Sequence, residues 1–360
     1  MKKIVYVIGH IGNGGAERVI SILANASIAE ENIIITLFSN KQDYHLNSNV
    51  RVIYIDVTSI KNPAWRCVKR VLLLRKAFRE ISPDIIVSFL AIINMYTVLA
   101  NLFTKQKVIL SERNDPKHEP NSKVLRCLRN RLYKLRKENY FVFQTQYALE
   151  CFNKKVAKKS RIIYNPIKSE LPKRDEKNTE HIICTVARLE EDKNLQLLIR
   201  AFSIVSKSTD YILQIFGIGP QKDELLELCN ELNITSKVYF MGFKKNVHEY
   251  IKKADMFVLP SNYEGISNAM IEALAIGIPT ISTDSPAYGA REFIDSGYNG
   301  FLIECNSLEQ LVEKMLWIIR HKQGANKLGE NAVAIRNILG EDKIISEWKQ
   351  YCLKVVRNGD

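Results

Sequence analysis

The 360-residue sequence predicts an α/β protein with two successive parallel β-sheets. Three observations lead to this prediction. Short apolar runs alternate with segments of helical spacing along the whole chain, the length suits two hydrophobic cores, and the composition changes near the middle. Hydrophobic residues make up 46% and charged residues 25%, which is typical of a globular protein.

The first half alternates predicted strands with helical segments. We expect strands at 4–8, 33–38, 52–55, 85–89, 108–110, 140–143 and 161–163, and helices at 16–29, 68–80 and 124–137. Residues 85–103 carry no charge, as a membrane span would. However, Ser88, Asn94 and Asn101 interrupt this run, so we predict a buried strand followed by a core helix through 95–102.

The second half repeats the alternation after a polar segment. Lys168 to Glu180 is charged and contains Pro172, which predicts a linker. We expect strands at 182–186, 211–216, 238–241, 256–259, 280–282 and 301–303, and helices at 194–206, 221–232, 247–252, 268–275 and 308–321. The predicted domains are 1–166 and 167–340, and residues 341–360 form a last helix that can pack back on the first domain.

Charge and cysteine content restrict the class of protein. Residues 1–165 hold 28 Lys and Arg against 12 Asp and Glu, a net charge of +16, whereas residues 166–360 hold 24 against 27, a net charge of −3. The two halves are therefore expected to have different partners. The seven cysteines are scattered and form no Cys-x-x-Cys pair, which argues against a disulfide framework and against a structural zinc site. We expect a reducing cytosol.

The segment from Glu264 to Glu272 is the strongest candidate site. It follows a predicted strand, and Ser267 can cap a helix that begins at Asn268 and ends at Gly277. The backbone amides at Gly265 to Asn268 and the positive helix end then suit a phosphate or another anion. The alternative interpretation is that Glu264 caps a turn and that Glu272 is a solvated helix residue.

Two other strand–loop junctions of the second half face the same expected edge. Arg188 and Lys193 follow the strand 182–186, where two cations suit a diphosphate leaving group. A surface loop in which these cations pair with Glu190 and Glu191 is the alternative. The turn at Gly219 follows the strand 211–216 and serves either as a base-binding loop or as a simple tight turn.

A glycine-rich turn, Gly9 to Arg18, follows the first strand. Its spacing does not match Gly-x-Gly-x-x-Gly, because Glu17 stands where the third glycine is required. A dinucleotide-dependent dehydrogenase is therefore disfavoured. Gly14 and Gly15 can still let a ligand approach the backbone.

These motifs, in this order, resemble the retaining glycosyltransferases of family 4. Gly-Gly-Ala-Glu-Arg at 14–18, Tyr-Asn-Pro-Ile at 164–167, Ala-Arg-Glu at 290–292 and Asn-Gly at 299–300 fit the family pattern, and the resemblance covers nearly the whole chain. It implies a GT-B fold, with two Rossmann-like domains facing a central cleft. The first domain would bind the acceptor, and the second would bind a nucleotide-sugar, UDP-sugar by family frequency.

The resemblance also implies roles for the site residues. Arg188 and Lys193 would bind the diphosphate, Glu264 would contact the transferred sugar, and Glu272 would hold the ribose hydroxyls. Further donor-binding residues would be Gly14, Gly15, Gly219, Gly265, Ile266, Ser267 and Asn268. The family's histidine in the first domain is not identifiable, because Ser-Glu-Arg-Asn-Asp-Pro stands at 111–116. His10 and His118 are candidates, and we favour neither.

No Asp-x-Asp motif occurs, which disfavours a metal-dependent mechanism, so we expect no metal and no cofactor. The expected reaction is front-face hexosyl transfer with retention of configuration, without a covalent nucleophile. Members with these motifs resemble enzymes of capsule, lipopolysaccharide or lipid-linked oligosaccharide assembly. The expected acceptor is thus a glycan or a polyprenyl-diphosphate-linked glycan.

The basic segments Arg66–Arg79 and Lys123–Lys137 each combine Lys and Arg with apolar residues. In the second, Val124, Leu125, Leu128, Leu132 and Leu135 form an apolar stripe. Such helices can lie on anionic lipid, so we expect a cytoplasmic protein that is peripheral on the inner face of the plasma membrane. The alternative is a core-packed helix with a solvated charged face.

Two other function classes remain open. The positive first half is compatible with nucleic-acid binding, although aromatic residues are sparse in the basic helices and no known module is present, so we expect no nucleic-acid partner. A nucleotide-sugar epimerase of the same fold is the other alternative, because a fold does not determine a reaction.

Overall fold

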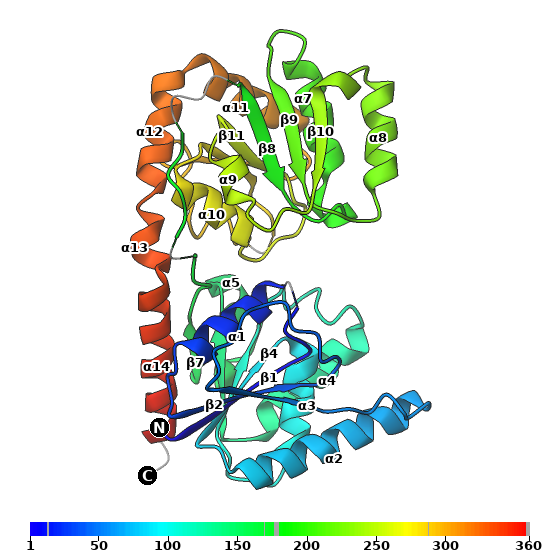
Figure 1. Cartoon of the computed structure of the whole chain (residues 1–360), viewed down its shortest axis with the longest axis vertical. Helices are drawn as coiled ribbons and strands as arrows, with labels where there is room; N and C mark the ends of the chain where they lie inside the picture. The colour runs from blue at the N-terminus through cyan, green and yellow to red at the C-terminus, as the bar shows by residue number, and fades with distance from the viewer. Residues whose placement is uncertain (13, 169, 176–179, 287, 358–360) are drawn as a thin grey trace. The chain divides into compact units, whose positions relative to one another are not determined.

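The computed structural model describes residues 1–12, 14–168, 170–175, 180–286 and 288–357. The description leaves out Asn13 of the glycine-rich turn. It also leaves out positions 169 and 176–179 of the predicted linker, and position 287. The chain divides into two compact units. One comprises Met1–Pro166 with Asp342–Asp360, and the other comprises Ile167–Glu341 (Figure 1).

The first unit contains a seven-stranded parallel sheet in the order β3-β2-β1-β4-β5-β6-β7. Its strands are β1 Lys3–Ile8, β2 Glu31–Thr36, β3 Val50–Tyr54, β4 Ile85–Phe89, β5 Val108–Ser111, β6 Asn139–Phe143 and β7 Ser160–Ile162. Its helices are α1 Gly15–Asn25, α2 Pro63–Ile81, α3 Ala91–Ala100, α4 Lys123–Leu135, α5 Gln146–Glu150 and α6 Lys154–Ala157.

The second unit contains a six-stranded parallel sheet in the order β10-β9-β8-β11-β12-β13. Its strands are β8 Ile182–Val186, β9 Ile212–Phe216, β10 Val238–Gly242, β11 Met256–Leu259, β12 Thr280–Thr283 and β13 Phe301–Ile303. Its helices are α7 Leu195–Val205, α8 Lys222–Glu231, α9 His248–Ile251, α10 Asn268–Ile276, α11 Leu308–Arg320, α12 Lys322–Ala332 and α13 Ile335–Leu339, with short 3-10 turns η1 Glu191–Lys193 and η2 Thr235–Lys237.

Both sheets confirm the predicted α/β class. Their central strands are apolar runs that are buried on both faces, as expected for parallel strands covered by helices. The uncharged run from 85 forms β4 and α3, with Asn94 and Thr97 buried and hydrogen-bonded. In the described part of the chain, no helix is long and apolar enough to cross a membrane. All seven cysteines are free thiols.

The predicted elements differ from the observed ones mainly in the helices. The segment 16–29 is helical only to Asn25, because Ser27 has a positive φ of 51° that ends the helix. Four helices were not predicted, α5, α6, α12 and α13. Their apolar positions are few, and α12 and α13 gain their stability by packing on α10 in the tertiary structure.

The last helix, α14 Glu341–Arg357, packs on the first unit (Figure 1). Its Trp348 is fully buried and stacks on Phe89 of β4, with ring centroids 5.6 Å apart. The Tyr351 hydroxyl donates to the Lys159 carbonyl at 2.8 Å. The Arg113 guanidinium lies 4.7 Å from the centre of the Phe89 ring and 5.4 Å from that of Trp348. These contacts attach α14 to the sheet through aromatic packing.

We expect Trp348→Ala to lower the free energy of unfolding by about 3–5 kcal/mol, because it leaves a large cavity beside Phe89 and Arg113. Urea denaturation followed by far-UV circular dichroism measures this change. The control is Trp65→Ala, since Trp65 is 58% exposed on α2 and its removal is expected to cost less than about 1 kcal/mol. Equal losses in the two variants would contradict the packing role of Trp348.

Candidate functional site

The candidate site lies at the carboxyl ends of β8 and β11. These two strands are neighbours in the second sheet, although β9 and β10 separate them in the chain. Strands β9 and β10 lie on one side of β8 in the sheet, whereas β11, β12 and β13 lie on the other side. Ligands of open parallel sheets bind at such a reversal of strand order, outside the carboxyl ends of the strands.

The site brings together two residues predicted from separate motifs. The ammonium nitrogen of Lys193 lies 2.7 Å from Oε2 of Glu264, and it also lies 3.0 Å from Oδ2 of Asp192. The Lys193 side chain is largely buried. Burial favours the neutral amine, but the Glu264 and Asp192 carboxylates outweigh it and raise the pKa of Lys193 above its usual value. The ammonium therefore stays charged.

Loop-to-loop hydrogen bonds hold this ion pair in place. The backbone N–H of Asn262 donates to the Asp192 carbonyl at 2.8 Å. The Asn194 side-chain amide donates to Oδ1 of Asn262 at 3.1 Å and to Oδ1 of Asn306 at 2.9 Å. Asn194 has a positive φ of 47°, a conformation that asparagine tolerates better than most residues. The loops after β8 and β11 are thus joined on both sides of Lys193.

Glu272 is paired with a residue that the sequence analysis missed. Its Oε2 lies 2.7 Å from Nε2 of His248, and both side chains are buried. The alternative of a solvated Glu272 is therefore wrong. His248 is the first residue of the short helix α9, and no local motif marks it. The two residues are 24 positions apart in the sequence, and only the packing of the second unit brings them together.

The segment between the two glutamates forms the predicted turn and helix. The Ser267 hydroxyl accepts the Met270 N–H at 3.4 Å, and Gly277 ends α10 with a positive φ of 92°, so both predicted caps are confirmed. Ile266 is buried and anchors the turn, and the Ser285 hydroxyl donates to the Glu264 carbonyl at 3.2 Å. Gly265 and Asn268 lie on either side of this anchored turn, next to the helix N-terminus.

Arg188 and Gly219 lie in loops of the same sheet, but their contacts are local. The Arg188 guanidinium is exposed and lies 2.7 Å from Oε1 of Glu190, as the alternative interpretation of this loop predicts. A Cβ at Gly219 would collide with the Leu189 backbone, whose N–H donates to the Ile218 carbonyl at 3.1 Å. The close approach of the Leu189 backbone is by itself sufficient to require glycine at 219.

Gly14 and Gly15 belong to the first unit, at the carboxyl end of β1. Gly14 precedes α1 and Gly15 is its first residue. A Cβ at Gly14 would collide with the carboxylate of Glu17, which is folded back over the turn. Burial raises the pKa of Glu17, while its own backbone N–H and nearby His10 act in the opposite direction. His10 Nδ1 accepts the Gly12 N–H at 3.0 Å and so stabilises the turn.

Other motif residues of the first unit have structural contacts. Arg18 donates to the Pro166 carbonyl at 2.6 Å, and Arg113 donates to Oδ1 of Asn165 at 2.9 Å. Both arginines therefore hold the segment where the chain leaves this unit. Desolvation lowers the pKa of Arg113 to about 9. Glu112 is buried against Tyr133 and Asn94, and desolvation raises its pKa.

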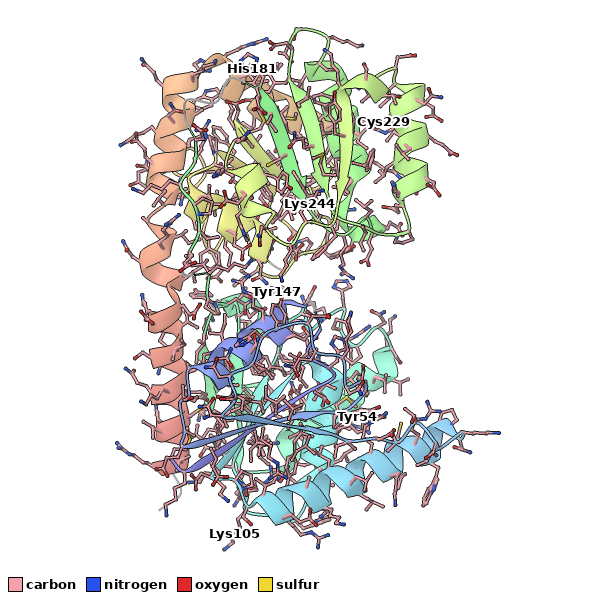
Figure 2. The ribbon with its side chains drawn as sticks, viewed as in Figure 1. Tyr54, Lys105, Tyr147, His181, Cys229 and Lys244 are labelled. Carbon is pink, nitrogen blue, oxygen red and sulfur yellow. The ribbon has the colours of Figure 1, made fainter. Side chains whose placement is uncertain are left out.

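His118 and Tyr147 lie near the carboxyl end of the first sheet. His118 Nδ1 lies 2.6 Å from Oδ2 of Asp115, and the Lys117 ammonium lies 5.1 Å from the centre of the Tyr147 ring. Figure 2 labels Tyr147 at this end of the sheet and Lys105 at the opposite end. Among the described residues, no group of three or more His, Cys, Asp or Glu side chains is arranged to hold a metal ion.

Comparison with known proteins identifies the family. The profile described as "Glycosyl transferases group 1" matches residues 167–334. A Campylobacter jejuni N-acetylgalactosamine-N,N'-diacetylbacillosaminyl-diphospho-undecaprenol 4-alpha-N-acetylgalactosaminyltransferase is 31% identical over 338 residues, which cover 88% of this chain and 90% of that protein. A second C. jejuni alpha-1,4-N-acetyl-D-galactosaminyltransferase, whose name specifies a diphospho-undecaprenol-linked acceptor, is 26% identical over 99% of both chains.

Solved structures share the fold. Anabaena HepE in complex with UDP is 18% identical, with a TM-score of 0.81 over 98% of this chain and all of that one. Sucrose-phosphate synthase from Thermosynechococcus elongatus is 17% identical, with a TM-score of 0.82 over the full length of both. These similarities confirm the predicted GT-B class. The chain belongs to the group 1 glycosyltransferases.

We expect His248→Ala to lower the free energy of unfolding by about 1–3 kcal/mol, because it removes a hydrogen-bond donor from the buried Glu272 carboxylate. Urea denaturation measures the change. The control is His181→Ala, which removes the 2.8 Å contact between His181 Nδ1 and Oδ1 of the exposed Asp210 at the amino end of the second sheet (Figure 2). That variant is expected to lose less than about 1 kcal/mol. A His248 variant as stable as the wild type would contradict this role.

Proposed function

We propose that this glycosyltransferase transfers a hexosyl residue from a UDP-sugar to a lipid-linked glycan, with retention of anomeric configuration. The observation that carries the proposal is the Lys193–Glu264 ion pair, which joins the loops after β8 and β11, with the paired Glu272 on α10, the helix that follows β11. The second unit would bind the donor and the first unit the acceptor. The alternatives of an epimerase and of a nucleic-acid-binding protein are not favoured.

The donor would bind along the junction of these two strands. Lys193 and Arg188 offer positive charge to the diphosphate, and the N-terminus of α10 adds backbone amides from Gly265 to Asn268. Glu272, held by His248, would accept hydrogen bonds from the ribose hydroxyls. Binding of UDP and UDP-glucose by the structurally similar Anabaena HepE supports a uridine nucleotide here.

The acceptor is proposed from the relatives. The two C. jejuni transferases are named for acceptors on diphospho-undecaprenol, and each is similar to this chain over most of its length. A glycan on polyprenyl diphosphate is consequently the acceptor class that we propose, within the assembly of a surface polysaccharide.

The proposed reaction proceeds on one face of the sugar. The bond between the anomeric carbon and the diphosphate oxygen breaks, and a bond to the acceptor oxygen forms on the same face. The departing diphosphate oxygen takes the proton of the acceptor hydroxyl. Arg188, Lys193 and the α10 amides would stabilise the charge that develops on the diphosphate, which is the role that a metal ion has in other transferases.

A membrane surface is proposed on the first unit, at α2. Trp65, Val68 and Leu72 recur at helical spacing on one face of α2, and Trp65 and Leu72 are 58% and 50% exposed. The Arg75 guanidinium donates to the Leu102 carbonyl at 2.6 Å and joins α2 to the loop where Phe103 is 97% exposed. Lys105 in this loop projects beside α2 (Figure 2).

Helix α4 also exposes apolar side chains. Val124, Leu128 and Leu135 are exposed, whereas Leu132 of the same stripe is buried together with Arg129, so the predicted apolar stripe is not core-packed except at Leu132. Apolar side chains among Lys and Arg bind anionic bilayers by burying apolar area and by electrostatic attraction of about 1 kcal/mol per cation near the surface. We therefore propose a peripheral location on the cytoplasmic face of the membrane.

The proposed reaction is tested with the purified chain, a panel of UDP-hexoses and UDP-N-acetylhexosamines, and an undecaprenyl-diphosphate-linked glycan. We expect one donor to release UDP only with acceptor, to give an α-linked product by NMR, and to react at the same rate with EDTA. Lys193→Ala is expected to lower kcat/KM by about 100-fold or more, whereas Lys207→Ala, in the exposed turn that follows α7, leaves it unchanged.

Each part of the proposal has its own contradicting outcome. Sugar interconversion without acceptor would favour an epimerase, and a β-linked product would overturn retention. Loss of activity with EDTA, restored by a divalent cation, would overturn the metal-free scheme.

The membrane surface is tested by flotation with vesicles of phosphatidylglycerol and phosphatidylethanolamine. We expect the wild type to float at low salt, and Val68→Ser with Leu72→Ser to reduce the bound fraction by about tenfold, because less apolar area is buried. The matched control is Ile204→Ser with Ile338→Ser, which removes exposed isoleucines from the second unit. Equal flotation of the two double variants would contradict a surface at α2.

A further inference from the structure

Lys193 is the cation on which the proposed diphosphate site depends, yet it has two carboxylate partners. Its ammonium lies 2.7 Å from Oε2 of Glu264 and 3.0 Å from Oδ2 of Asp192. Arg188, the other cation of the site, lies 2.7 Å from Oε1 of Glu190. Two cations thus face three paired carboxylates, and the paired charges sum to −1. As arranged, this constellation does not favour a diphosphate, because its carboxylates repel the phosphate oxygens.

Glu264 is the closer carboxylate partner of Lys193, and it comes from a different loop. Asp192 is the neighbour of Lys193 in η1, so its carboxylate stays beside the ammonium whatever Glu264 does. The Glu264 side chain is longer than that of Asp192 and about a quarter exposed. Within the described part of the chain, its carboxylate has only a 3.5 Å contact from the Ser261 hydroxyl besides Lys193. The Glu264 carbonyl accepts the Ser285 hydroxyl, which anchors the main chain. The Glu264 side chain can therefore rotate while its backbone stays in place.

We infer that Glu264 makes the site discriminate between UDP-sugar and UDP. This inference rests on the proposed function. A diphosphate competes with the Glu264 carboxylate for Lys193. When the diphosphate carries a sugar, the sugar hydroxyls donate hydrogen bonds to Glu264 and compensate it for the lost ion pair. UDP has no such hydroxyls, so the displaced carboxylate is left beside the phosphates and returns to Lys193. Glu264 thereby weakens product binding and promotes product release.

Isothermal titration of UDP, UDP-sugar and uridine tests this inference in wild type and two Glu264 variants. The UDP-sugar is whichever conjugate binds the wild type. Glu264→Gln removes the competing charge with little change in shape, so we expect UDP to bind about tenfold more tightly and UDP-sugar to bind equally or more weakly. Glu264→Asp keeps the charge but shortens the side chain, so UDP stays weak and UDP-sugar loses affinity. Uridine, which lacks phosphates, is expected to bind all forms alike.

The matched control is Glu190→Gln, which removes a carboxylate at the same 2.7 Å distance from the neighbouring cation Arg188. A general gain in positive charge would raise the affinity for UDP and for UDP-sugar by the same factor in both Gln variants. The inference requires the ratio of the two affinities to change in Glu264→Gln and to stay constant in Glu190→Gln.

The outcomes separate this inference from the proposed function. A wild type that binds neither UDP nor any UDP-sugar would overturn the proposed function and the inference with it. A wild type that binds UDP-sugar while Glu264→Gln leaves the affinity ratio unchanged would overturn only the inference. Thermal unfolding of each variant in buffer checks that the second unit remains folded, and Glu264→Asp provides the comparison if Glu264→Gln does not fold.

Discussion

The adjacency of β8 and β11 in the second sheet is the constraint on which the candidate site depends. Parallel strands carry their loops at the same edge, and neighbouring strands bring those loops within side-chain reach. Lys193 follows β8, and Glu264 follows β11, so a 71-residue separation in sequence becomes a direct ion pair. Asn194 and Asn262 then join the two loops by hydrogen bonds. Without the central pairing of these strands, neither motif would form a site.

Two carboxylates of the second unit, Glu264 and Glu272, are paired, and the pairs have distinct consequences. The Glu272–His248 pair is enclosed, which fixes the carboxylate in one orientation. The Lys193–Glu264 pair is more open and contains an excess of carboxylate, which leaves it able to exchange partners. Neighbouring motifs can thus have opposite properties, one rigid and one labile, because burial and the number of partners differ between them.

In the first unit, several signature residues contact the chain itself. Arg18 and Arg113 hold the segment that ends at Pro166, and Glu17 occupies the space over Gly14. The motif Ser-Glu-Arg-Asn at 111–114 contributes a buried glutamate and a buried arginine to the interior around β5. In this chain these motif residues therefore serve in part to support the backbone, and the first unit contains fewer exposed polar candidates than its motifs suggest.

Local sequence was sufficient to predict the thirteen strands of the described residues and the caps at Ser267 and Gly277, because periodicity and capping depend on neighbours in the chain. Partners were decided only by tertiary structure. His248 carries no local signal, the exposed face of α4 depends on which side meets α3, and the contacts of Lys193 depend on strand order. These are properties of non-local packing, in which residues far apart in sequence compete for the same space and the same hydrogen bonds.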